Sequence, residues 1–216
     1  MPVTRYSGLI ITTLIALPGW TAAVAQATAP PANWVVRTDA VPTASQVAVR
    51  AARGGVRVTT GPAAILYDSA LRAAGDWRIE ASMLLFEPGG RAEGFGVFFG
   101  GRDLTGPAQR YAYVLVRRDG RALLKVRDGA AVRTVRDWTA SAAVPQWRAT
   151  GVPGASVRYP LVVEARGERV TLLIGATTIL DVPRAEVPTD GIVGLRINHA
   201  LDVHLESLRV TPLPTR

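Results

Sequence analysis

The feature that most constrains the fold is a succession of short apolar segments separated by turns that contain glycine. The segments "YAYVLVRR" (111–118) and "RALLKVR" (121–127) flank Asp119-Gly120, and a second Asp-Gly pair at 128–129 leads into 131–138. An Asp-Gly pair between two strands is typical of a type I′ hairpin, whose central residues take positive φ angles. We therefore predict an antiparallel meander over residues 110–138.

The C-terminal third repeats this pattern, with Gly167-Glu168 and Gly175-Ala176 as its first two turns. The strands predicted there are 161–166, 169–174, 178–182, 192–198 and 202–211. In the last of them the apolar phase slips, which predicts a β-bulge near Glu206-Ser207.

Shorter β-branched or alternating segments precede the meander. The strands predicted there are 34–37, 46–50, 56–60 and 77–86. Residues 63–74 fit a short helix or a strand equally well. About a dozen short strands at regular spacing predict an all-β protein, a two-sheet antiparallel β-sandwich of the jelly-roll type.

The N-terminus has the pattern of an export signal. Arg5 precedes a short apolar run at 9–17, and two A-x-A sites follow, so we expect a signal peptide at 1–25 with cleavage near 25–27. The run is too short to span a bilayer, which takes about 20 residues, although an uncleaved anchor is the alternative. We then expect a flexible leader at 26–33, a single domain at 34–216, and no membrane span after cleavage.

This organisation predicts a periplasmic or secreted protein. The chain has no cysteine, which argues against a small disulfide scaffold. Its net charge of +8 does not indicate a nucleic-acid partner, because 24 of its 25 basic residues are arginines interleaved with acids, and Lys125 is the only lysine.

The stretch "EGFGVFFGGRD" (93–103) is rich in glycine but does not match a phosphate-binding loop. Its glycine spacing is one residue off the dinucleotide fingerprint, and no helical pattern follows. A strand fits better, with Phe95, Val97 and Phe99 in the core. Glycines on its other face, including Gly96 and Gly100, would let a ligand or another backbone approach.

Searches for catalytic motifs mostly fail. No cysteine and no nucleophile elbow are present. His199 and His204 are five residues apart, which on one strand places them on opposite faces, so we expect no metal site there. Glycoside hydrolysis needs two carboxylates across a cleft, and distant pairs such as Glu93 with Asp103 or Glu206 stay open.

Taken in order, the motifs resemble the concanavalin A-like lectin/glucanase superfamily, and specifically its bacterial exported laminin-G-like and 3-keto-disaccharide hydrolase-like domains. The resemblance covers about residues 76–211. It rests on the segments "WRIEA" (77–81), "GFGVFFGGRD" (94–103), "YAYVLVRRDGR" (111–121), "LVVEARGERVTLLIG" (161–175) and "DGIVGLRINH" (190–199). It implies a jelly roll whose concave sheet binds glycans in many relatives. The glucanase carboxylate motif is missing from this chain, and the calcium ligands of some relatives cannot be placed on it.

The leading hypothesis is an exported, non-catalytic module that binds a glycan or a cell-envelope polysaccharide. The residues expected to bind it are Tyr111, Tyr113, Arg117, Arg102, Asp103, Trp138, Trp147, Asn198 and His199. No cofactor is expected, although a structural calcium ion stays open. One alternative is a hydrolase active on glycosides, with Glu93, Asp103, His199 or Glu206 as acid or base. The other is a structural or protein-interaction domain of the envelope.

Overall fold

The structure is a computed structural model that describes residues 33–39, 47–52, 54–88 and 90–214. The predicted signal peptide and all of the predicted leader except its last residue lie outside these ranges. Within them, the only helical element is the 3₁₀ turn η2 (Arg184–Glu186). No helix among the described residues is long and apolar enough to cross a membrane.

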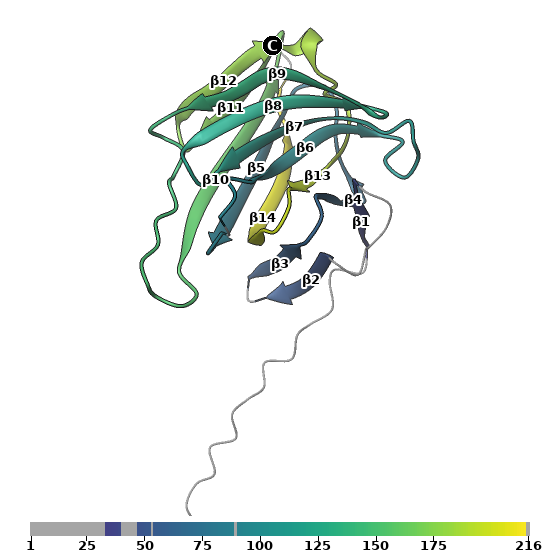
Figure 1. Ribbon diagram of the computed structural model, residues 1–216. Coiled ribbons are helices and arrows are strands. Elements are labelled where there is room, and N and C mark those ends of the chain that lie inside the picture. Colours follow the sequence, from purple (N-terminus) through teal and green to yellow (C-terminus); the bar gives the residue numbers. More distant parts are fainter. Residues whose placement is uncertain (1–32, 40–46, 53, 89, 215–216) are drawn as a thin grey trace, which may run out of the picture.

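The strands form two sheets of seven strands each, stacked as a sandwich (Figure 1). Sheet I has the order β1 (Trp34–Thr38), β4 (Ala64–Ala73), β13 (Gly191–Ile197), β6 (Gly94–Arg102), β7 (Arg110–Arg117), β8 (Arg121–Asp128) and β9 (Ala131–Ala140). Sheet II has the order β12 (Thr177–Pro183), β11 (Arg169–Ile174), β10 (Ser156–Arg166), β5 (Trp77–Phe86), β14 (Asp202–Pro212), β3 (Gly55–Thr60) and β2 (Val47–Ala52).

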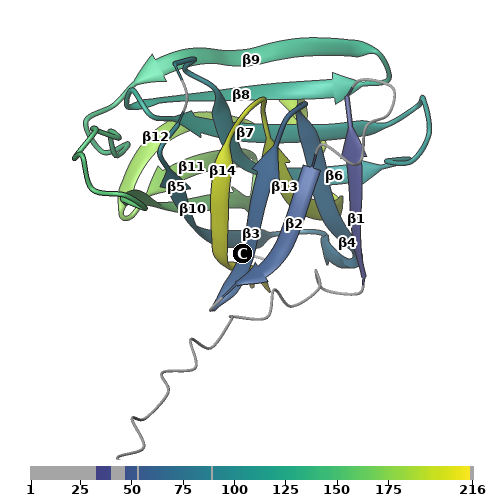
Figure 2. The same ribbon diagram turned by 60° about the horizontal axis from the view of Figure 1, so that its bottom comes forward.

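All strand pairs in both sheets are antiparallel. Figure 2 shows β6, β7, β8 and β9 side by side in one layer and β14, β3 and β2 in the other. The predicted two-sheet antiparallel sandwich is therefore confirmed.

The core between the sheets follows the alternation read from the sequence. Trp77 and Ile79 of β5 are fully buried, as are Phe95 and Phe99 of β6. The rings of Trp77 and Phe99 lie 5.3 Å apart between centroids and join the two layers. Apolar residues at every second position therefore stabilise the sandwich by burying one face of each sheet.

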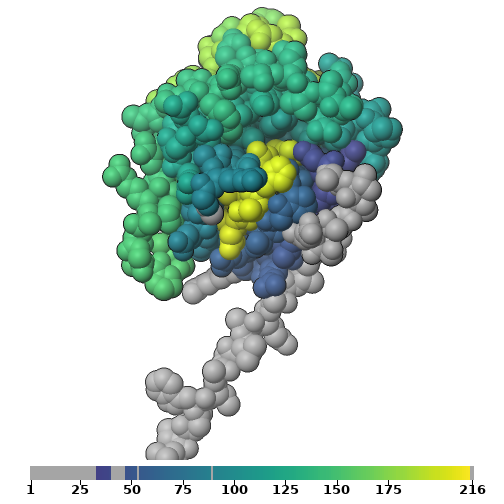
Figure 3. All heavy atoms as spheres, in the orientation of Figure 1, coloured from purple at the N-terminus to yellow at the C-terminus, as the bar shows by residue number. Residues whose placement is uncertain are grey.

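Segments far apart in the sequence lie next to one another. β14, near the C-terminus, pairs with β3 and β5, and β13 pairs with β4. In the space-filling view the yellow C-terminal part of the chain lies between the blue and purple N-terminal strands and the green centre (Figure 3). The folded domain therefore needs both ends of the described chain.

The structure decides two local predictions. Residues 64–73 are a strand, β4, and not a helix, because they pair with β1 on one side and β13 on the other. The predicted bulge in β14 is confirmed by a register shift between Leu205 and Ser207.

The type I′ prediction at Asp119-Gly120 is wrong. Arg117 pairs with Arg121, so the loop has three residues, and of these Gly120 alone has a positive φ, of 80°. This is the usual form of a three-residue hairpin, in which a glycine in the left-handed region follows a type I turn. The meander itself, from β7 to β9, is as predicted.

Candidate glycan-binding groove

The outer face of sheet I, turned away from the core, carries a second buried cluster. Its members are Ile65, Tyr67, Phe98, Leu104, Tyr111, Tyr113, Leu115 and Leu123. All of them except Leu104, which lies in the β6–β7 turn, alternate along their strands with the core positions, so they lie on the opposite side of the sheet. The outer face of an antiparallel sheet is commonly polar and solvated, so this aromatic face is a candidate for contact with a ligand.

A groove of about 300 Å³ opens on this face. Its lining comes from β6, β7, β8, β9 and β13 and the segments next to them: Ala92, Glu93, Gly94, Tyr113, Leu115, Leu123, Lys125, Trp138, Arg196, Asn198 and His199. Because most of these side chains stand on hydrogen-bonded strands, the groove is held rigidly.

Trp138 lies across the sheet from β9 toward β6. Its Cη2 atom is 2.8 Å from the position that a Cβ on Gly94 would occupy. Three strand spacings in a flat sheet are about 14 Å, which is longer than a tryptophan side chain. The β8–β9 end of sheet I must therefore bend over its outer face, which makes that face concave.

Arg117 fixes the indole of Trp138. Its guanidinium carbon is 4.4 Å from the ring centroid, and its Nε donates to a carboxylate oxygen of Asp119 at 2.6 Å. A cation over an aromatic face is attracted by the ring quadrupole. The Trp138 indole is thus held in the groove by stacking with Arg117 and by packing against Gly94, which has no side chain to displace it.

A buried ion pair stands beside the tyrosines. Arg196 of β13 is 6% exposed, and its Nη1 donates to Asp39 Oδ1 at 2.7 Å while Nη2 donates to the other carboxylate oxygen. Nη1 also lies 3.5 Å from the hydroxyl of Tyr111, and the guanidinium lies 5.6 Å from the ring centroid of Tyr113. Arg127 of β8 approaches Asp39 at 3.9 Å, so two arginines share one carboxylate.

Burial and charge shift the pKa values of these groups. Burial, the largest effect, acts to raise the pKa of Asp39, but the hydrogen bond and charge of Arg196, with the charges of Arg127 and His199, outweigh it and hold the pKa below its usual value. Burial raises the pKa of the hydroxyls of Tyr111 and Tyr113, against the opposing charge of Arg196. Both tyrosines are therefore neutral donors at pH 7.

Glu93 and His199 meet at the rim of the groove. His199 Nδ1 lies 3.8 Å from Glu93 Oε2. Asn198 follows β13 directly, and its backbone N–H donates to the carbonyl of Gly94 at 3.0 Å. This hydrogen bond joins the end of β13 to the start of β6. It places the Asn198 amide, the His199 imidazole and the Glu93 carboxylate next to one another at the rim.

The structure brings together six of the nine predicted binding residues. Tyr113, Trp138, Asn198 and His199 line the groove. Arg117 stacks on Trp138, and Tyr111 lies below with 1% of its surface exposed, within reach of Arg196.

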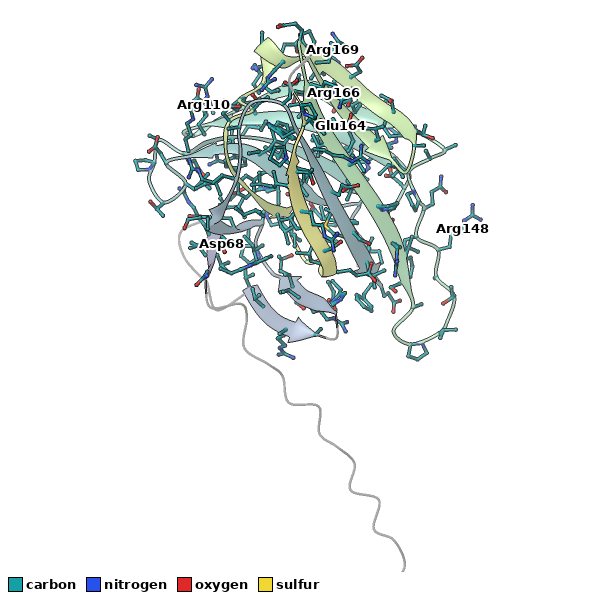
Figure 4. All side chains as sticks on the ribbon, turned by 180° about the vertical axis from the view of Figure 1, so that it is seen from behind. Asp68, Arg110, Arg148, Glu164, Arg166 and Arg169 are labelled. Carbon is teal, nitrogen blue, oxygen red and sulfur yellow. The ribbon has the colours of Figure 1, made fainter. Side chains whose placement is uncertain are left out.

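The other three lie elsewhere. Arg102 ends β6 at the opposite end of sheet I, where it lines a separate pocket with Arg110 and Arg133. Asp103 follows it in the turn, with a positive φ of 51°. Figure 4 shows Arg110 at the margin of the sandwich and Arg148 on the long β9–β10 loop. Trp147, next to Arg148, packs against the main core and lines a pocket with Glu87, residues 149–153 and Ala155.

Of the other acid and base candidates, Glu206 is remote from the groove. It lies on sheet II, where it accepts hydrogen bonds from Ser82 Oγ and Arg158 Nη2, both at 2.6 Å. His204, also on β14, is 7% exposed. Within the described ranges, no three histidine, aspartate or glutamate side chains group as metal ligands.

The protein itself takes the space beside the glycines of β6. A Cβ on Gly96 would lie 2.2 Å from the carbonyl oxygen of Val114, and one on Gly100 would lie 2.3 Å from that of Pro188. Gly96 and Gly100 therefore allow close approach of another backbone segment, and not of a ligand. Gly94 makes room for the Trp138 ring.

Sequence reasoning missed Lys125, Arg196 and Asp39. Lys125 and Arg196 are cations inside apolar strands, "RALLKVR" and "GIVGLRIN", at outer-face positions. A charged residue within an otherwise apolar strand was the feature of the sequence that could have identified both of them. Nothing local marked Asp39.

Gly94→Ala should disturb the groove more than the fold. The new Cβ would lie 2.8 Å from the far tip of the Trp138 ring and 3.1 Å from Cδ1 of Leu115, so we expect the indole to swing away and Leu115 to shift slightly, at a stability cost of about 1 kcal/mol. The near-ultraviolet circular dichroism of the protein should change. Gly90→Ala is the control, because nothing lies within 4 Å of its Cβ position. Equal spectra for both variants would contradict the packing described.

No protein-family model matches the chain. No curated protein is similar to it in sequence. The fold, in contrast, is similar to that of solved structures. The carbohydrate-binding module CBM66 from Bacillus subtilis is similar at a TM-score of 0.60 and 13% identity, over 86% of this chain and 96% of that one.

Two other structures widen the comparison. The exoplasmic/lumenal domain of VIP36, in its Ca²⁺/Man-bound form, is similar at a TM-score of 0.59 and 11% identity, over 85% of this chain and 84% of that one. A native glycosidic hydrolase is similar at a TM-score of 0.56 and 10% identity, over 85% and 92% of the respective chains. At these identities the likeness is one of fold alone: the chain has the two-sheet antiparallel jelly-roll β-sandwich of these structures.

Proposed function

We propose that this chain is an exported module that binds carbohydrate in the groove on the outer face of sheet I. The observation that carries the proposal is the position of the Trp138 indole beside Lys125, Arg196, Asn198 and His199 in one concave groove. Likeness of fold to a carbohydrate-binding module supports it, although fold alone does not determine function.

The chemistry of the groove suits a sugar ring. A flat indole can pack against the C–H face of a pyranose, and the amide, imidazole, ammonium and carboxylate beside it can exchange hydrogen bonds with hydroxyls. Rigid aromatic side chains lose little conformational entropy on binding. Stacking with Arg117 and packing against Gly94 fix the position of the indole in the free protein.

The groove favours binding over hydrolysis. Among its lining residues Glu93 alone carries a carboxylate, whereas glycoside hydrolysis uses two carboxyl groups about 5–9.5 Å apart. Asp103 and Glu206, the other acidic candidates, lie on a remote turn and on sheet II.

Titration of the purified protein against a panel of defined oligosaccharides tests this proposal. We expect saturable binding of at least one sugar class in the micromolar to millimolar range. A panel that gives no binding at millimolar concentration would contradict it, and would leave a structural or protein-interaction role as the better account. Export is tested separately by N-terminal sequencing of the protein from the culture fractions, with a new terminus expected near residues 25–27.

A hydrolase is the second candidate, because Glu93 and His199 lie 3.8 Å apart at the groove and could transfer a proton. Incubation with disaccharides and their 3-keto forms tests it. Release of a monosaccharide by the wild type, lost in Glu93→Gln and in His199→Ala, would favour catalysis. Binding without turnover favours the module.

A further inference from the structure

Lys125 stands out among the charged residues of the groove. It is the only lysine of the chain, and it lies half-buried on the outer face of β8, which has neighbouring strands on both sides. Among the described residues, no carboxylate lies within 4.0 Å of its ammonium, and no hydrogen bond of its side chain is found. Glu93 and Arg196, the other charged lining residues, each have a partner.

The groups nearest along this face do not compensate the charge of Lys125. Arg127 follows two positions on along the same face of β8, and Arg196 also lines the groove. These two arginines share the single carboxylate of Asp39. The carboxylate of Asp39 is thus already shared by two arginines, and a partly desolvated cation without a partner, such as Lys125, is costly.

The groove is also polarised along its length. Lys125 pairs with Tyr113 on β7, whereas Glu93 precedes Gly94, which pairs with Arg117. Four residues along a strand separate these two positions, a distance of about 13 Å. Arg117, at the Glu93 end, has its own carboxylate partner in Asp119. The uncompensated positive charge of the groove therefore lies at its Lys125 end, whereas Glu93 and Asn198 at the other end can exchange hydrogen bonds with neutral hydroxyls.

We propose that the sugar in this groove carries an anionic group, a uronate carboxylate, and that Lys125 binds it. This inference rests on the proposed function and gives it a ligand class. The carboxylate would lie between the Lys125 ammonium and the arginines that share Asp39, with the ring toward Trp138. Sulfated sugars offer related charge but a different geometry, so they form a separate arm of the test.

The experiment uses matched oligosaccharides titrated against the full chain by calorimetry. Oligomers of galacturonate, glucuronate and mannuronate are each compared with their carboxyl-reduced neutral forms and with a sulfated oligomer of the same length. We expect a uronate to bind at least tenfold more tightly than its neutral counterpart, with an advantage that falls as salt rises. We also expect Lys125→Met to remove at least tenfold in affinity.

Two controls separate charge at this position from charge in general. Lys125→Arg keeps the positive charge and should retain most of the uronate affinity. Arg209→Met removes an exposed cation from sheet II and should leave binding unchanged. Because Lys125 is the only lysine, reductive methylation with ¹³C-formaldehyde labels it together with the N-terminal amine, and its resonance should shift when the uronate binds.

The outcomes distinguish the two proposals. If neutral and acidic oligomers bind equally and Lys125→Met binds as the wild type does, the uronate inference fails while glycan binding stands. If no oligomer binds, both fail. Preference for the sulfated oligomer over every uronate would overturn the assignment of a carboxylate.

Discussion

Replacing Trp138 with alanine should weaken glycan binding by about 30-fold or more. The indole is the largest flat surface in the groove, and aromatic side chains at the centre of a binding site commonly contribute about 2 kcal/mol or more. The ring is also held in place by stacking with Arg117 and by packing against Gly94, so the wild-type indole loses little conformational freedom when the glycan binds. Titration of the variant with the glycan that binds the wild type best measures this loss.

Trp147→Ala is the matched control, because it removes the same side chain from the pocket lined by Glu87 and the β9–β10 loop. Binding by this variant should stay within about threefold of the wild type. A glycan that loses affinity in Trp147→Ala and not in Trp138→Ala would move the site to the pocket beside the β9–β10 loop.

Asp39→Ala should destabilise the fold by about 3 kcal/mol. The variant leaves Arg196, which is 6% exposed, without the only carboxylate that pairs with it among the described residues. An uncompensated buried charge is far more costly than the pair is favourable. Asp39 itself is 31% exposed, so water relieves part of the cost. Urea unfolding at pH 7 measures the change.

The comparison pair for this variant is Arg57–Asp202, joined at 2.7 Å with side chains 43% and 29% exposed. Exposed ion pairs contribute about 1 kcal/mol or less, so Asp202→Ala should cost much less than Asp39→Ala. Equal losses of unfolding free energy in the two variants would contradict the claim that burial of Arg196 makes the loss of its partner more destabilising.

The pH dependence of stability provides an independent check. The pKa of Asp39 is lowered in the folded protein, so its stabilising charge is fully present above the unfolded pKa, near 4, and is lost as the pH falls through the folded value. The stability difference between wild type and Asp39→Ala should therefore be full at pH 7 and shrink below about pH 4. A difference that is independent of pH would exclude the ion pair as its source.

Most of the fold could be predicted from the sequence because its determinants are local. Alternation placed Trp77, Ile79, Phe95 and Phe99 in the core, and glycines located the hairpins. The turn type predicted at Asp119-Gly120 was wrong. The number of residues in the loop depends on where the two strands stop pairing, and the sequence does not determine that point.

The site was only half predictable because it depends on contacts between distant segments. Asp39 and Arg196 are 157 positions apart, and no local pattern pairs them. Trp147 looked equivalent to Trp138, but its backbone N–H donates to the carbonyl of Arg118 at 3.0 Å, which fixes that end of the loop against the core. Arg102 and Asp103 follow the aromatic strand in sequence, yet they lie beyond its far end.

The most direct test of a glycan site on the outer face of sheet I asks which indole senses the ligand. The chain has five tryptophans, which 5-fluorotryptophan labels, and single Trp→Phe variants assign their ¹⁹F resonances. We predict that titration with the best-binding glycan shifts the Trp138 resonance and leaves those of Trp77 and Trp147 unchanged. A glycan that shifts Trp147 while Trp138 stays in place would contradict the account.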